Sequence, residues 1–138
     1  MKILLAADGS EYTRKAARFV AQHVGWLKDK PEIIVHHVRP KFPFPGGVGG
    51  STIERYEREE ADKALAVAAG ELTAAGVAHE TAYTVGDVAE EVAAVAKRRG
   101  VDIVVVGSHG HGALAKLALG SVATKLLAVV EAPVLVVR

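Results

Sequence analysis

Three closely spaced glycines near the carboxyl end of the chain have the composition of an anion-binding loop. Gly107, Gly110 and Gly112 directly follow the apolar run 103–106, which is typical of a strand buried on both faces. Because glycine has no Cβ, the main chain here can take positive φ angles and approach a ligand closely. The run and the loop together predict a strand that ends at a binding site.

A second motif, Gly120-Ser121, begins after nine residues that follow Gly110. It opens an apolar run with helical spacing that ends before Pro133, so a helix is predicted to begin there. The first amides of a helix have no partner within the helix and carry the positive end of its dipole. A strand, a glycine loop and a helix N-terminus in this order can therefore bind a phosphate group.

The spacing of these motifs differs from two better-known phosphate loops. The chain contains no G-x-x-x-x-G-K-[ST] run, which excludes a Walker A loop. Gly107, Gly110 and Gly112 are also spaced differently from the dinucleotide fingerprint G-x-G-x-x-G. Lys116, between the two glycine motifs, could contact a phosphate or could equally be solvated.

The histidines of the chain predict binding or structural roles rather than catalysis. His109 and His111 lie within the glycine loop, and an imidazole can donate to a phosphate or move a proton. No carboxylate or nucleophile stands near them in the sequence, so we expect no catalytic residue. His36 and His37 are adjacent on a predicted strand, point to opposite faces and cannot easily share a metal ion. We therefore interpret this pair as structural.

Strand and helix patterns alternate along the whole chain. Strands are predicted at 2–7, 32–38, 77–85, 102–106 and 133–138, and helices follow Ser10, cover 52–75, follow Asp87 and follow Gly120. Gly100 is predicted to stop the helix that follows Asp87. The inward-facing residues predicted for the helix over 52–75 are Ile53, Tyr56, Ala64, Leu65, Ala68 and Leu72. The broken segment 39–51 is predicted to be a loop. This alternation predicts one α/β domain over 1–138, a doubly wound parallel sheet of Rossmann-like type with strand order 3-2-1-4-5 and helices on both faces.

That strand order brings two distant segments together. Strands 1 and 4 are neighbours where the winding reverses, and ligands of such sheets bind there, at the carboxyl ends of the strands. Ala7-Asp8-Gly9 and Gly107-Ser108-His109 should therefore meet. Asp8 alone could equally be a turn or capping residue, but its place at this point favours a role in binding.

Taken together, these motifs resemble the universal stress protein family. Gly107-x-x-Gly110, nine residues and Gly120-Ser121 match the G-2x-G-9x-G-[S/T] pattern of its ATP-binding branch, and Asp8-Gly9-Ser10, Gly86-Asp87 and the closing Pro133-Val-Leu-Val-Val extend the resemblance over essentially the whole chain. The resemblance implies an adenine nucleotide alpha hydrolase-like fold that binds ATP, with Mg²⁺ bridging the phosphates. The nucleotide-binding residues it implies are Ala7, Asp8, Val38 (by its backbone, at the adenine edge), Gly107, Ser108, His109, Gly110, His111, Gly120, Ser121, Val122 and Ala123.

Two positions depart from the family pattern. Ala7 stands where relatives often have proline or valine, and Ala123 replaces a frequent serine or threonine. One hydroxyl that would face the phosphates is lost at Ala123. A neutral hydrogen bond contributes about 0.5 to 1.5 kcal/mol, so we expect affinity to be several-fold weaker without being abolished.

The function implied is that of a nucleotide-gated stress-response or signalling module. No Walker-type lysine or arginine finger is recognisable, so any ATPase activity should be weak or need a partner. Two alternatives stay open: an interaction module of the same fold that binds no nucleotide, and a slow nucleotide hydrolase.

Composition limits the partners and the compartment. The 17 basic residues nearly balance 16 acidic ones, so bulk charge indicates neither a nucleic-acid nor a membrane partner. The chain has no cysteine, and its first apolar stretch is too short for a signal peptide, which predicts a cytoplasmic protein.

The last strand should lie at a sheet edge, where the family commonly dimerises, so a homodimer is expected; protein partners remain unknown. The 39–51 loop could close over the nucleotide.

Overall fold

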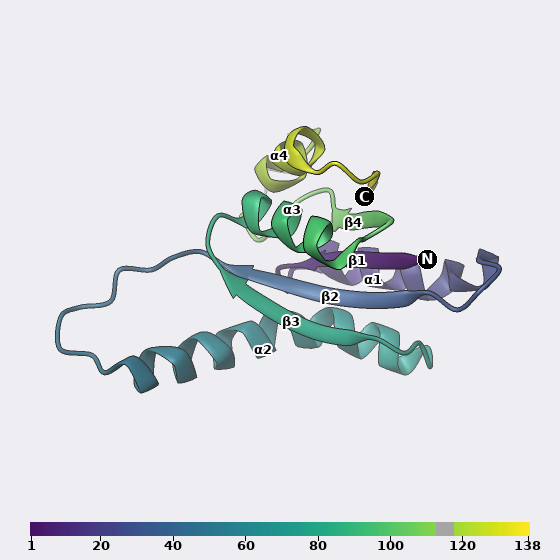
Figure 1. Ribbon diagram of the computed structural model, residues 1–138. Helices are drawn as coiled ribbons and strands as arrows, with labels where there is room; N and C mark the ends of the chain where they lie inside the picture. Colours follow the sequence, from purple (N-terminus) through teal and green to yellow (C-terminus); the bar gives the residue numbers. More distant parts are fainter. Residues whose placement is uncertain (113–117) are drawn as a thin grey trace.

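The sequence folds around a five-stranded parallel sheet, shown in Figure 1 for a computed structural model that describes residues 1–112 and 118–138. The strand order is β3-β2-β1-β4-β5, which confirms the predicted doubly wound topology. The strands are β1 (Lys2–Ala7), β2 (Glu32–Arg39), β3 (Glu80–Val85), β4 (Ile103–Gly107) and β5 (Val134–Val137). The helices are α1 (Glu11–His23), α2 (Gly50–Ala74), α3 (Val88–Arg99) and α4 (Ser121–Val129), with a 3-10 turn at Val24–Trp26. Lys116 lies outside the described residues.

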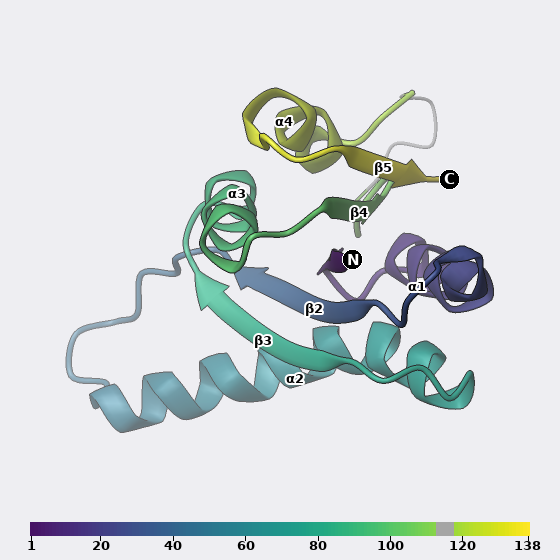
Figure 2. The same ribbon diagram turned by 45° about the vertical axis from the view of Figure 1, so that its right-hand side comes forward.

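Helices cover both faces of the sheet (Figure 2). Alternate residues of each strand point to opposite faces, so β1 sends Leu4 toward the layer of α3 and α4 and Leu5 toward the layer of α1 and α2. Both leucines are fully buried. In register, Leu4 lies between Ile34 of β2 and Val104 of β4. The uninterrupted apolar strands are explained by this two-sided burial.

The predicted helix ends are set by local hydrogen bonds. Ser10 Oγ accepts from the amide of Thr13 at 3.3 Å, and Asp87 Oδ1 accepts from the amides of Ala89 and Glu90 at 3.1 and 3.2 Å. Gly100 ends α3 with a φ of 61°, in the left-handed region. These caps place the starts of α1 and α3 just beyond the carboxyl ends of β1 and β3.

Helix α2 differs from its prediction. Leu65, Ala68 and Leu72 are buried as expected, but Tyr56, expected to face inward, is 47% exposed. The first half of α2 extends past the body of the domain together with the preceding loop (Figure 1). Tyr56 instead packs edge-on to the ring of Phe44, with ring centroids 6.0 Å apart, and lies under the Arg39 guanidinium.

The third strand is shorter than predicted. It begins at Glu80 rather than at residue 77, because Gly76 turns the chain with a φ of 69° and the Val77 amide donates back to the Leu72 carbonyl. Among the described residues, no helix combines the length and the apolar character that crossing a membrane requires.

Candidate functional site

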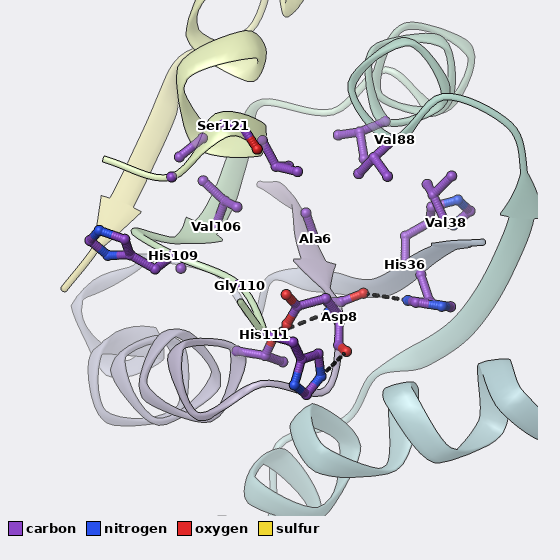
Figure 3. A pocket seen from close by; sticks show the side chains of 18 of the residues that line it. Ala6, Asp8, His36, Val38, Val88, Val106, His109, Gly110, His111 and Ser121 are labelled. Carbon is purple, nitrogen blue, oxygen red and sulfur yellow. Dashed lines mark hydrogen bonds between the residues drawn. The ribbon is translucent and has the colours of Figure 1, made fainter. Parts of the chain in front are cut away.

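A cavity of about 540 Å³ opens at the carboxyl ends of β1, β2 and β4, where the winding of the sheet reverses (Figure 3). Every residue of the predicted site except Ser108 lines it. Its walls also include Gly112 of the predicted glycine loop and residues that the sequence did not single out for binding, namely Ala6, Thr13, His36, His37, Pro40, Val88, Val92 and Val106. The topology therefore brings the two ends of the chain into one pocket, as the strand order predicted.

The glycines of the loop do not use the positive φ angles that glycine allows. Among the described residues, positive φ occurs at Gly9, Gly47, Gly76 and Gly100, and at no glycine of the loop. Backbone conformation therefore does not explain why glycine stands at these positions.

Close packing explains the loop glycines instead. A Cβ on Gly107 would lie 2.7 Å from the Cβ and 2.8 Å from the carbonyl carbon and oxygen of Tyr12 on α1. A Cβ on Gly110 would lie 2.7 Å from Oδ2 of Asp8. No atom of the described residues lies within 4 Å of a Cβ built on Gly112. Two of the three glycines thus allow the loop to lie directly against α1 and against the end of β1.

The loop and the start of α4 are joined directly. The Gly120 amide donates to the Ser108 carbonyl at 2.7 Å, and a Cβ on Gly120 would lie 3.1 Å from that oxygen and from the Cα of His109. Ser108 itself is only 1% exposed, and its hydroxyl bonds to Nδ1 of His109 at 3.0 Å. The structure therefore places Ser108 beneath the loop and outside the pocket, where it supports His109.

The N-terminus of α4 presents backbone donors to the cavity. Gly120 provides no side-chain cap, and the first hydrogen bond within the helix runs from the Thr124 amide to the Gly120 carbonyl at 3.0 Å. Residues 121–123 precede that bond and all line the pocket. Their amides and the positive end of the helix dipole favour an anion at this wall.

Asp8 combines the turn role with a place in the pocket. Its Oδ1 accepts from the Ser10 amide at 2.8 Å and from the Thr13 hydroxyl at 2.7 Å, which fixes the carboxylate. Its other oxygen faces Gly110. His111 Nε2 donates to the Asp8 carbonyl at 2.8 Å and so ties the loop to the end of β1. Among the described lining residues, Asp8 is the only carboxylate.

Apolar side chains form the opposite part of the cavity. Val38 of β2 and Val106 of β4 contribute from the sheet, and Val88 and Val92 contribute from α3. We call these four valines the apolar compartment. It suits the faces of a planar ring, as in most small-molecule sites. The position of Val88 in the pocket could have been predicted from the sequence, because the cap at Asp87 starts α3 at the same edge of the sheet.

The two strand histidines lie on opposite faces, as predicted, yet both line the pocket. His37 Nδ1 donates to the Ala7 carbonyl at 2.7 Å. His36 is 2% exposed, and its Nε2 lies 3.1 Å from the Thr84 hydroxyl. Burial, with a smaller contribution from the charge of His37, lowers the pKa of His36 from 6.5 to about 4, so its ring is neutral at neutral pH. Both histidines therefore line the pocket, in addition to the structural role that the sequence predicted for them.

This fold and this pocket define a class of proteins. An open parallel α/β sheet that is wound both ways from its centre binds ligands at the switch point, and here that point holds a glycine loop, a helix N-terminus and an apolar compartment. The sequence model of the Universal stress protein family matches residues 1–138. The chain belongs to the universal stress protein family.

Individual relatives agree with this assignment. The chain is 32% identical to universal stress protein YxiE of Bacillus subtilis over 99% of this chain and 98% of that protein. Among solved structures, that of MJ0577, whose sequence is from Methanocaldococcus jannaschii, is 30% identical, covers 99% of this chain and 94% of its own, and superposes with a TM-score of 0.75.

Two solved universal stress proteins of the same fold carry nucleotides. One is in complex with cAMP, at 22% identity and a TM-score of 0.73, covering 100% of this chain and 97% of that one. The other, from Archaeoglobus fulgidus, is in complex with dAMP, at 20% identity and a TM-score of 0.70, covering 100% and 98%. At these identities the likeness establishes the shared fold.

Proposed function

We propose that this protein binds an adenine nucleotide, ATP with Mg²⁺, and acts as a nucleotide-gated stress-response or signalling module in the cytoplasm. The observation that carries the proposal is the pocket itself, in which the first amides of α4, unpaired within the described part of the chain, and a glycine loop lie beside an apolar compartment. The cAMP and dAMP complexes of relatives support the choice of an adenine nucleotide. A cavity of about 540 Å³ falls within the usual range for such ligands.

The two halves of the pocket suggest how the ligand lies. The phosphates are expected at the loop and at the amides of Ser121, Val122 and Ala123, and the base is expected in the apolar compartment beside Val38. This orientation pairs the anionic end of the ligand with the helix dipole and its flat end with the valines.

The chemistry of the pocket fits a cation held mainly by the ligand. In residues 1–112 and 118–138, no group of three or more His, Cys, Asp or Glu side chains could hold a metal ion alone. The lining includes one carboxylate, Asp8, and no lysine or arginine among the described residues. A carboxylate beside phosphates repels them unless a cation lies between, and Mg²⁺ prefers phosphate oxygens with one or two carboxylates. The Asp8 oxygen that faces Gly110 would be the protein ligand, directly or through water.

A charge placed at the proposed phosphate site provides the first test. Ser121→Asp puts a carboxylate at the first position of α4. Its interaction with the helix dipole stabilises the helix by about 0.3 to 1 kcal/mol, but its charge repels phosphates. We expect MgATP affinity by calorimetry to fall roughly tenfold or more, as expected for a like charge at close range, while the melting temperature stays equal or rises. Ser51→Asp, at the start of α2 and outside the pocket, is the control and should bind as wild type does.

Measurements on the wild-type protein distinguish the proposal from its alternatives. Mass spectrometry of small molecules released on denaturation should detect an adenine nucleotide near one per chain, and titration with MgATP should give heat. Absence of both would favour an interaction module without nucleotide. Phosphate release that grows linearly with time at catalytic protein concentration would instead indicate a hydrolase, although the buried hydroxyl of Ser108 offers no nucleophile for it.

We further propose a homodimer through β5. This strand ends the sheet and pairs only with β4 among the described strands. The Pro133 and Val137 carbonyls bond to β4, so by the two-residue alternation of a strand the Val136 amide faces the open edge. Val136→Pro removes that donor without touching the bonds to β4. We expect light scattering to give twice the chain mass for wild type and the single mass for the variant; a monomeric wild type would contradict the proposal.

A further inference from the structure

His36 is a polar side chain in the wall of the pocket on the α3 side, next to the apolar compartment (Figure 3). It follows from the alternation of β2 that His36 shares a face with Ile34 and Val38, both of which belong to the core under α3. Its neighbours in register are Ala6 on β1 and Ala82 on β3. Both are small, so neither side chain carries a polar group to the imidazole.

One nitrogen of this imidazole is unsatisfied. Nε2 is paired with the Thr84 hydroxyl, whereas Nδ1 is buried and has no partner among the described residues. A buried polar atom without a partner destabilises the fold and calls for an explanation, such as a group that arrives from outside the protein. The pocket wall to which His36 belongs is where such a group would enter.

We propose that His36 reads the polar edge of the bound base, with Nε2–H donating to Thr84 and Nδ1 accepting from the exocyclic amino group of adenine. The inference rests on the proposed function and deepens it. Apolar pockets gain specificity from a few placed polar groups, and the neutral ring provides a free acceptor within a wall of alanine and valine. Thr84 is then a positioning residue, because its hydroxyl holds Nε2 and so orients the ring, and it can accept from Nε2–H in the tautomer that leaves Nδ1 as the acceptor.

The test compares two ligands that differ only at the amino group: AMP and purine riboside 5′-monophosphate, which has hydrogen in its place. For wild type we expect AMP to bind roughly fivefold to tenfold more tightly, as one hydrogen bond provides. For His36→Leu the ratio should fall to near one. His36→Asn keeps an acceptor close to the position of Nδ1 and should retain part of the preference. His79→Leu, at the opposite end of the sheet, should keep the full ratio.

The measured quantity is a ratio of two affinities for each variant. A general change in the pocket alters both affinities equally and leaves this ratio unchanged. Measurable binding by wild type with an unchanged ratio in His36→Leu would overturn this inference and leave the proposed function intact. Absence of nucleotide binding by wild type would overturn both.

Discussion

Gly107→Ala is expected to lower the free energy of unfolding by about 2 to 3 kcal/mol, the range for overpacking a filled interior. The new Cβ would lie 2.8 Å from the carbonyl carbon and oxygen of Tyr12. Those atoms are backbone of the first turn of α1, so no rotation of a side chain relieves the contact. Either α1 or the end of β4 must move, and both contribute residues to the pocket.

Chemical denaturation of wild type and variant measures this effect. Gly112→Ala is the matched control, because it makes the same substitution in the same loop, with no heavy atom of the described residues within 4 Å of the new Cβ and without a positive φ. It should change the free energy of unfolding by less than about 0.5 kcal/mol. Equal stability of the two variants would show that contact with α1 does not explain the glycine at 107.

Acid is expected to weaken the fold through His36, in a pH range above that of the carboxylates. The pKa of His36 is lowered by burial from 6.5 to about 4, so between these values the unfolded chain binds a proton that the folded chain does not. Stability therefore falls as pH decreases from 6.5 toward 4, by about 2 kcal/mol between pH 7 and pH 5 and about 3 kcal/mol by pH 4. A protonated ring would need a second acceptor, and Nδ1 has none.

The charged groups around His36 contribute in both directions. His37, Arg98 and Arg99 lower its pKa and Glu91 raises it, each by less than burial does. Hydrogen bonds from Arg18 and Arg14 are the chief cause that lowers the pKa of Glu71 in the folded chain. Glu71 therefore stabilises the fold at pH values above 4.5, its pKa in the unfolded chain, and this stabilisation is lost only at lower pH. The interval from 6.5 to 4.5 therefore isolates His36 from this carboxylate.

Denaturant unfolding at several pH values in this interval measures the slope. His36→Leu should remove most of the difference between pH 7 and pH 5, whatever its effect on stability at pH 7, and His79→Leu should preserve it. If His36→Leu kept the full slope, the titration of another group would have to account for it.

The local features of this protein follow from its sequence. The caps at Ser10 and Asp87, the left-handed stop at Gly100 and the apolar strands depend on residues within a few positions of one another, and each was predicted. The alternation of strands and helices predicted the sheet order as well, because right-handed crossovers leave few topologies. That order by itself places Asp8 and the glycine loop at one edge of the sheet.

Only the tertiary structure decided what these residues contact. Gly107 meets Tyr12 and Gly110 meets Asp8 across roughly a hundred positions of sequence, so their need for glycine could not be distinguished from a need for positive φ. Tyr56 has helical spacing typical of a buried residue, but α2 is longer than the surface it covers. The unpaired nitrogen of His36 depends on three strands and one helix packing together. Spacing along the chain fixes which residues share an edge or a face, whereas the distances across that edge depend on how the packed elements fit.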